Sequence, residues 1–218
     1  MAWEKDLVVV AADEDVLAII KTIVMTRRES LRLRQIAADE TDFRKDVLHD
    51  SSPPIVMATL LRPYLRTHHR AMVVRDLEGS GYTCAAALEN DIRQAVEQNG
   101  WEKERVEVIV IEPEVEAWLR FHSAHLLRLV RKNKRLRSGP LPNFKQKLAA
   151  SIEKHGGETD GKPKRPKEVF EDVLDVYHIP RSASLYKQLA DSESLKDCAV
   201  PSFCKLVAAL QEWFPATP

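Results

Sequence analysis

Short runs of apolar, β-favouring residues alternate with helical patterns along the first half of the chain, and this alternation most constrains its fold. The runs typical of strands buried on both faces are LVVVAA at 7–12, AMVV at 71–74 and VEVIVI at 106–111. Helical spacing of apolar residues is found at 16–24, 53–66 and 83–98. This order predicts an α/β fold with a sheet of about four mainly parallel strands flanked by helices.

Two further elements are predicted in this half. Leu31, Leu33 and Ile36 alternate with arginines and suggest a more exposed strand. The acids and proline at 112–114 predict a helix start directly after the third apolar run, because proline is favoured at the first helical position. In such a helix, Glu112 and Glu116 would face the same way, one turn apart.

The second half reads as short helices without a convincing strand. A loop rich in Gly, Lys and Pro lies near 156–167. We therefore predict an α/β domain at 1–120 and a helical lobe at 121–218 that packs on it.

Cysteine usage and hydropathy bear on the cellular compartment. The chain has 3 cysteines and none lies in a CxxC pair, so a disulfide framework is not expected and a reducing cytoplasm is. No stretch reaches the ~18 apolar residues that a membrane span needs. We expect a cytoplasmic protein without a membrane partner.

Charge is divided unevenly along the chain. Lys and Arg number 33, as do Asp and Glu, which excludes a uniformly basic nucleic-acid-binding coat. Residues 120–167 nevertheless hold 14 Lys and Arg against 3 Asp and Glu. This block is either a solvated face or a contact for a nucleic-acid backbone. The candidate binding residues are Arg131, Lys132, Lys134, Arg135, Lys162, Lys164, Arg165 and Lys167. Arg181 and Tyr186 could join a phosphate site or simply begin a helix.

Acidic residues follow three of the predicted strands. They are found at 13–15, at Asp76 and Glu78, and at 112, 114 and 116. Because ligands bind beyond the carboxyl ends of parallel strands, these acids should converge. Carboxylates crowded together raise one another's pKa, and Mg²⁺ or Mn²⁺ would relieve that cost. Such ions support phosphodiester chemistry. The alternative for each group alone is a helix cap.

These motifs together resemble a known family over nearly the whole chain. A strand followed by an acid and a later strand followed by D-x-E look like the Toprim fold of topoisomerases, primases and small nucleases. A closer resemblance is to the small Toprim-like component of the methylation-associated anti-phage defence system. That component is itself related to a wider family with an EAW motif. The motifs that carry the resemblance are VVVAADED, RDLEGSG, IEPEVEAWL, KPKRPKE, IPRSASLYKQLA and SFCKLVAALQEWFP.

The resemblance implies roles for individual acids. Asp76 and Glu78 match the Toprim metal-binding pair, and Glu114 and Glu116 match the acids of the PE-x-E-x-W motif. The Glu-Gly that usually follows the first Toprim strand is absent, so Asp13 or Glu14 would have to replace the general acid or base. The implied catalytic residues are thus Asp13, Glu14 and Asp76, and the metal ligands Asp76, Glu78, Glu114 and Glu116.

Two functions of different class follow. The first is a Mg²⁺-dependent nuclease or phosphodiesterase of anti-phage defence. The second is a non-catalytic Toprim-fold subunit that binds protein partners or nucleic acid in a multi-protein defence complex, which the missing Glu-Gly favours. Nucleotide sensing in the same acidic pocket is a third hypothesis, with less support from the motifs.

Overall fold

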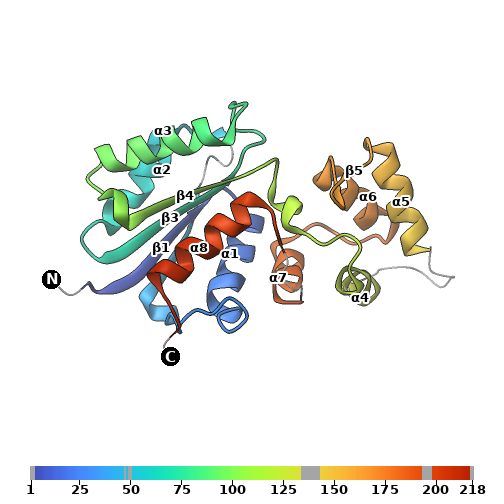
Figure 1. Cartoon of the computed structure of the whole chain (residues 1–218), viewed down its shortest axis with the longest axis horizontal. Coiled ribbons are helices and arrows are strands. Elements are labelled where there is room, and N and C mark those ends of the chain that lie inside the picture. The colour runs from blue at the N-terminus through green and yellow to red at the C-terminus, as the bar shows by residue number, and fades with distance from the viewer. Residues whose placement is uncertain (1–2, 47, 49–50, 134–142, 193–197, 217–218) are drawn as a thin grey trace.

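The four-stranded parallel sheet is the centre of the molecule. The structure, a computed structural model, describes residues 3–46, 48, 51–133, 143–192 and 198–216 (Figure 1). The strands are β1 (Lys5–Ala11), β2 (Thr41–Lys45), β3 (His68–Asp76) and β4 (Val106–Ile111), in the order β2-β1-β3-β4. All three pairings are parallel. The predicted α/β sheet with flanking helices is confirmed, and its layout is consistent with a Toprim-like description.

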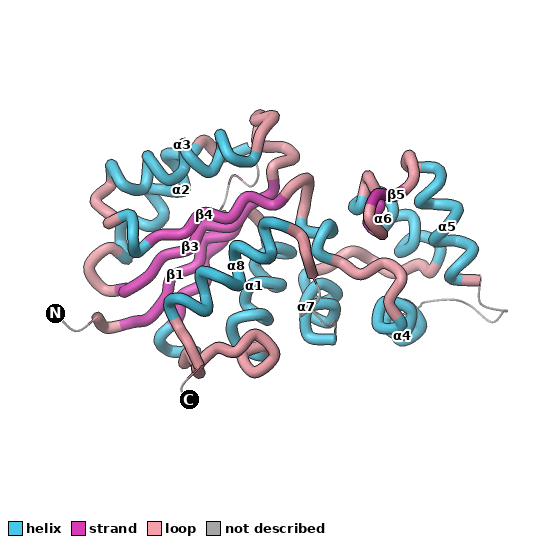
Figure 2. The backbone as a smooth tube through the Cα atoms, viewed as in Figure 1, coloured by secondary structure: helices cyan, strands magenta, loops and turns pink. Residues whose placement is uncertain are grey.

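Helices cover both faces of this sheet and continue beyond it (Figures 1 and 2). They are α1 (Glu14–Thr26), α2 (Pro54–Leu61), α3 (Ala85–Gln98), α4 (Ala124–Asn133), α5 (Phe144–Lys154), α6 (Pro166–Val176), α7 (Ala183–Ser192) and α8 (Pro201–Trp213). Among the described residues, 3-10 turns lie at Ala38–Glu40, Arg62–Tyr64, Lys103–Arg105 and Val115–Trp118. A short hairpin pairs β5 (Glu158–Thr159) with β6 (Lys162–Pro163).

Alternation along the strands separates two apolar cores. Leu7 and Val9 of β1 face one core, with α1 and α8, whereas Val8 and Val10 face the other, with α2 and α3. Strand side chains alternate between the two faces of a sheet, so a continuous apolar run fits a strand that is buried on both sides. This three-layer arrangement explains why β1, β3 and β4 were predictable.

The helical second half does not form one separate body. Helices α4, α5 and α6 stand beside the sheet, while α7 packs on α1 and α8 returns across a sheet face (Figure 1). Buried residues of α4–α8 belong to the same apolar core as the α1 side of the sheet. The polypeptide of 121–218 is therefore joined to the sheet by a continuous core. Among the described residues, no helix is long and apolar enough to span a bilayer.

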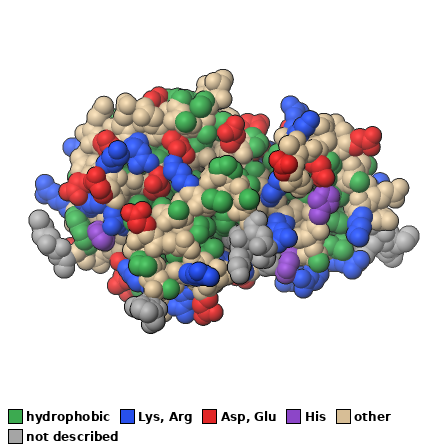
Figure 3. All heavy atoms as spheres, viewed as in Figure 1, with side chains coloured by type: hydrophobic (Ala, Val, Ile, Leu, Met, Phe, Trp, Pro, Cys, Tyr) green, Lys and Arg blue, Asp and Glu red, His purple; other side chains and the backbone are tan. Residues whose placement is uncertain are grey.

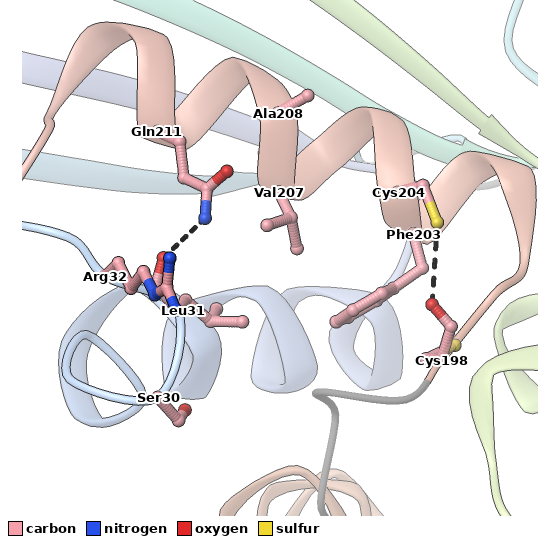
Figure 4. A pocket seen from close by; sticks show the side chains of 9 residues that line it. All are labelled: Ser30, Leu31, Arg32, Cys198, Phe203, Cys204, Val207, Ala208 and Gln211. Atoms are coloured by element: carbon pink, nitrogen blue, oxygen red, sulfur yellow. Dashed lines mark hydrogen bonds between the residues drawn. The ribbon is translucent and has the colours of Figure 1, made fainter.

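The strand predicted at 31–36 is wrong. Arg32 has φ 58°, which interrupts an extended backbone, and Leu33 makes only an isolated bridge with Pro215. Leu31, Leu33 and Ile36 are instead buried in the core. A groove of about 310 Å³ separates this turn from α8, and the Gln211 side chain donates a hydrogen bond to the Leu31 carbonyl at 2.8 Å (Figure 4).

The helix predicted to start at Glu112 is also wrong. The Glu112–Pro113 peptide is cis, Glu114 is extended, and only the 3-10 turn Val115–Trp118 follows. Glu112 is exposed whereas Glu116 is buried, so the two acids do not share a face. The extended backbone carries the Glu114 side chain inward, where charged groups of the second half meet it.

Charged side chains occupy the outer side of β4, where no strand among the described residues pairs with it. Glu89 accepts from the Val110 N–H at 3.2 Å, Lys205 donates to the Val108 carbonyl at 2.7 Å, and Arg93 donates to the Val106 carbonyl at 3.1 Å. Ion pairs join Lys205 to Glu89 and to Glu107, whose carboxylate accepts from the Val108 N–H. Backbone groups that would pair with a fifth strand are thus satisfied by side chains.

Candidate functional site at the carboxyl end of the sheet

We call the surface formed by the residues that follow the four strands the carboxyl end of the sheet. Backbone hydrogen bonds join the segments that follow β3 and β4. The Leu77 N–H donates to the Ile111 carbonyl at 2.8 Å, and the Glu78 N–H donates to the Pro113 carbonyl at 3.1 Å. The segment after β3 therefore runs beside the segment after β4, as the parallel order predicts.

The first acidic group lies at the start of α1. Asp13 is its N-cap, and its Oδ1 accepts from the Val16 N–H at 2.8 Å. Glu14 is exposed and lies 3.7 Å from the Lys45 ammonium. Asp15 pairs with Arg181 at 2.9 Å. Asp13 thus performs the capping role that was the alternative to a catalytic one.

Arg181 joins the first acidic group to the third. Its guanidinium contacts Asp15, Glu171 at 3.1 Å and Glu116 at 3.4 Å. The Tyr186 hydroxyl donates a hydrogen bond to the same Glu116 oxygen, Oε1. We call these five residues the Arg181 cluster. It connects α1, the turn after β4, α6 and α7.

Burial sets the ionisation of the Arg181 cluster. Glu116 is 1 % exposed, and this burial raises its pKa even though Tyr186 and Arg181 oppose the shift. Burial also raises the pKa of Asp15, against Arg181. The Glu116 Oε2 atom has no hydrogen-bond partner among the described residues. Removing Arg181 would therefore leave a buried acid with little compensation.

Glu114 is paired separately, with Lys167 at the start of α6. Burial is the main cause that raises the pKa of Glu114 to about 7; the carboxylates of Glu116 and Glu78 contribute to this rise, and the Lys167 ammonium opposes it. Burial works against the charge of Lys167, but the Glu114 carboxylate outweighs it and raises the pKa of Lys167. Glu78 and Glu116 thus each lie close enough to Glu114 to disfavour its charged form.

Two acids at the end of the sheet are buried by the strands themselves. Asp76, the last residue of β3, is 5 % exposed. Asp46 follows β2, is fully buried, and accepts from the Leu48 N–H at 3.0 Å. Its Oδ2 has no hydrogen-bond partner among the described residues. Sequence reasoning missed Asp46 because β2, with Phe43 as its single apolar residue, was not recognised as a strand.

The proposed metal ligands do not surround a common point in this arrangement. Among the residues that the structure describes, no three His, Cys, Asp or Glu side chains are grouped so that they could hold one ion. Glu78 and Glu114 supply the oxygen atoms that Mg²⁺ or Mn²⁺ prefers. Glu114 and Glu116, however, already face cations of the same chain. These two acids would have to exchange their present partners to bind a metal ion.

The basic residues predicted for nucleic-acid binding have different surroundings. Arg131, Lys132, Lys164 and Arg165 are exposed, although Arg165 also lies 3.4 Å from Glu168. Lys162 donates to the Ala117 and Leu119 carbonyls at 2.9 and 2.7 Å, so its ammonium holds the β5–β6 hairpin on the turn after β4. Lys167 faces Glu114. Lys134 and Arg135 lie outside the described residues.

No protein-family model, curated protein or solved structure matches this chain.

The raised pKa of Glu114 predicts a pH dependence of stability. Between its ordinary value of 4.5 and about 7, the folded chain holds a proton on Glu114 that the unfolded chain has released. The stability contributed by this proton is complete below about pH 4.5 and lost as the pH rises to about 7. Between about pH 5 and about pH 7.5, the unfolding free energy of both proteins can change. We expect it to fall by about 1–2 kcal/mol more in wild type than in Glu114→Gln.

Urea unfolding of both proteins across that pH range provides the measurement. Histidines and other carboxyl groups titrate in both proteins, so the difference between the two curves isolates Glu114. Parallel curves would show that Glu114 ionises as it does in the unfolded chain.

Proposed function

We propose that this chain is a Toprim-fold subunit of a multi-protein anti-phage defence complex, located in the cytoplasm, that binds nucleic acid without cleaving it. The observation that carries the proposal is the pairing of the acidic residues with cations of the same chain. Lys167 and Arg181 neutralise Glu114, Glu116 and Asp15. These ion pairs hold the helical second half on the carboxyl end of the sheet.

The uneven distribution of charge supports nucleic acid as the partner. Residues 120–167 carry 14 basic and 3 acidic side chains, and four of the proposed contacts are exposed. On the face drawn in Figure 3, Lys, Arg and His side chains gather over α4. Basic surfaces of this kind attract phosphate backbones through counterion release. The other subunits of the defence complex would bind elsewhere on the chain.

A Mg²⁺-dependent nuclease or phosphodiesterase is the second candidate function. The approach of Glu78 and of Glu116 to Glu114, whose charged form they disfavour, favours it. A divalent cation would supply Lewis-acid activation of a phosphate and of water. The ammonium of Lys167 would first have to leave Glu114. The acids proposed for that function are Asp13, Glu14, Asp76, Glu78, Glu114 and Glu116.

Calorimetric titration with Mn²⁺ separates the two functions. We expect wild type and Asp76→Asn to give the same weak, non-saturable heats, because Glu114 and Glu116 already face cations of the same chain. Saturable binding by wild type that Asp76→Asn abolishes would overturn the non-catalytic proposal. Lys167→Met is the informative third protein, because it frees Glu114 without adding a ligand. Saturable binding by this variant alone would show that Lys167 occupies a latent cation site.

A further inference from the structure

A small cavity lies between α4 and α7, away from the carboxyl end of the sheet. It measures about 250 Å³ and is lined by His125, Arg128, Leu129, Lys132, Gln188 and Asp191. We call it the α4 pocket. Its size suits a phosphate group together with part of a sugar. It is smaller than the pockets that hold drug-sized ligands.

Three basic side chains of the α4 pocket come from one helix face. His125, Arg128 and Lys132 are spaced at i, i+3 and i+7, which places them on the same side of α4. The Arg128 Nη2 atom lies 3.1 Å from the His125 Nδ1 atom. The Arg128 guanidinium keeps its charge at any physiological pH and can bind two phosphate oxygens at once.

The single acid that lines the α4 pocket is engaged with α1. The Asp191 Oδ1 atom accepts from the Thr26 hydroxyl at 3.1 Å, and the Asp191 carbonyl accepts from the Arg27 guanidinium at 3.0 Å. Asp191 therefore makes its contacts with another helix rather than with Arg128 or Lys132. The lining as a whole has an excess of positive charge.

We propose that the α4 pocket binds one backbone phosphate of a nucleic-acid strand. Arg128 and Lys132 contact the phosphate oxygens, and His125 positions the Arg128 guanidinium. Arg131 lies one residue from Lys132 on the exposed side of α4 and is placed for a neighbouring phosphate. This inference rests on the proposed nucleic-acid function. The α4 pocket would add a defined phosphate site to the general attraction between the basic surface and the nucleic acid. Its contacts would be to the nucleic-acid backbone and not to the bases.

Fluorescence anisotropy with labelled mixed-sequence oligonucleotides tests the site. The proteins are wild type, the double variant Arg128→Gln/Lys132→Gln, and a charge-matched control. Lys145→Gln/Lys147→Gln serves as that control, because both lysines are exposed on α5 within the same basic block and do not line the pocket. Single-stranded DNA, duplex DNA and RNA are compared between about 50 and 200 mM salt. Circular dichroism establishes that each variant is folded.

The expected result is a loss of at least about tenfold in affinity for the Arg128→Gln/Lys132→Gln protein, with a salt slope lower by about 2. The α5 control should change affinity by less than about threefold. Equal losses in the two double variants would overturn the α4 pocket and leave the proposed nucleic-acid function standing. Absence of oligonucleotide binding by wild type at low salt would overturn both. A parallel titration with inorganic phosphate distinguishes a nucleic-acid site from a site for a free anion.

Discussion

Replacing Arg181 by alanine is expected to lower the free energy of unfolding by about 3 kcal/mol at neutral pH. Arg181 is the common partner of Asp15, Glu171 and Glu116, and Glu116 is 1 % exposed. Without the guanidinium, the buried Glu116 carboxyl would lose its ion pair and keep its hydrogen bond from the Tyr186 hydroxyl. Removing one member of a buried ion pair is costly because the other charge stays uncompensated. Urea unfolding at neutral pH gives the measurement.

Two controls make the Arg181 prediction specific. Arg165→Ala removes an exposed guanidinium with a single ion pair to Glu168, and should cost less than about 1 kcal/mol. In a Glu116→Gln background, Arg181→Ala should cost clearly less than in wild type, because the most buried of its acidic partners then carries no charge. Equal costs for Arg181→Ala and Arg165→Ala would contradict the account of the Arg181 cluster.

Replacing Trp118 by alanine is expected to cost about 4 kcal/mol of unfolding free energy. The Trp118 ring is 2 % exposed and packs edge-on against Phe203 of α8, with 5.3 Å between ring centroids. Its indole N–H donates to the Ser202 hydroxyl at 3.0 Å. The tryptophan of the EAW motif therefore joins the turn after β4 to the last helix, and its loss would leave a large cavity between them.

Graded variants separate the parts of that effect. Ser202→Ala removes the hydrogen-bond acceptor of the indole and should cost about 1 kcal/mol. Trp118→Phe keeps most of the apolar volume and should lie between Ser202→Ala and Trp118→Ala. Trp118→Phe should also retain oligonucleotide affinity within about threefold of wild type, since the residue is placed in the core. A folded Trp118→Phe protein that no longer binds would give this motif residue a direct role.

Most of the sheet could be predicted from the sequence because three strands are buried on both faces. Burial on both faces leaves a nearly continuous apolar run, as in β1, β3 and β4. The edge strand β2 has little of this signal, because it contains charged residues around Phe43. The alternating apolar residues near 31–36 imitate a strand, but they are buried in the same apolar core as α1 and α8 instead.

The positions of the acids were more predictable than their partners. Parallel strands end at the same side of a sheet, so the approach of Glu78 to Glu114 follows from the strand order. The partner of Glu114 is Lys167, and that of Glu116 is Arg181, both far along the chain. Neither pairing has a local pattern, because it depends on how α6 and the start of α7 pack on the turn after β4.

The charged residues along the outer side of β4 limit how another protein can bind at this edge of the sheet. Extended peptides of any sequence can add to a free strand through the backbone groups that they all share. Here Glu89, Glu107, Lys205 and Arg93 already hold those groups. We expect proteins that bind near β4 to recognise side chains instead of backbone groups. The choice of partner there would then depend on individual side chains, each of which a single substitution can change. In a crowded assembly, this arrangement permits many specific neighbours and disfavours indiscriminate growth of the sheet.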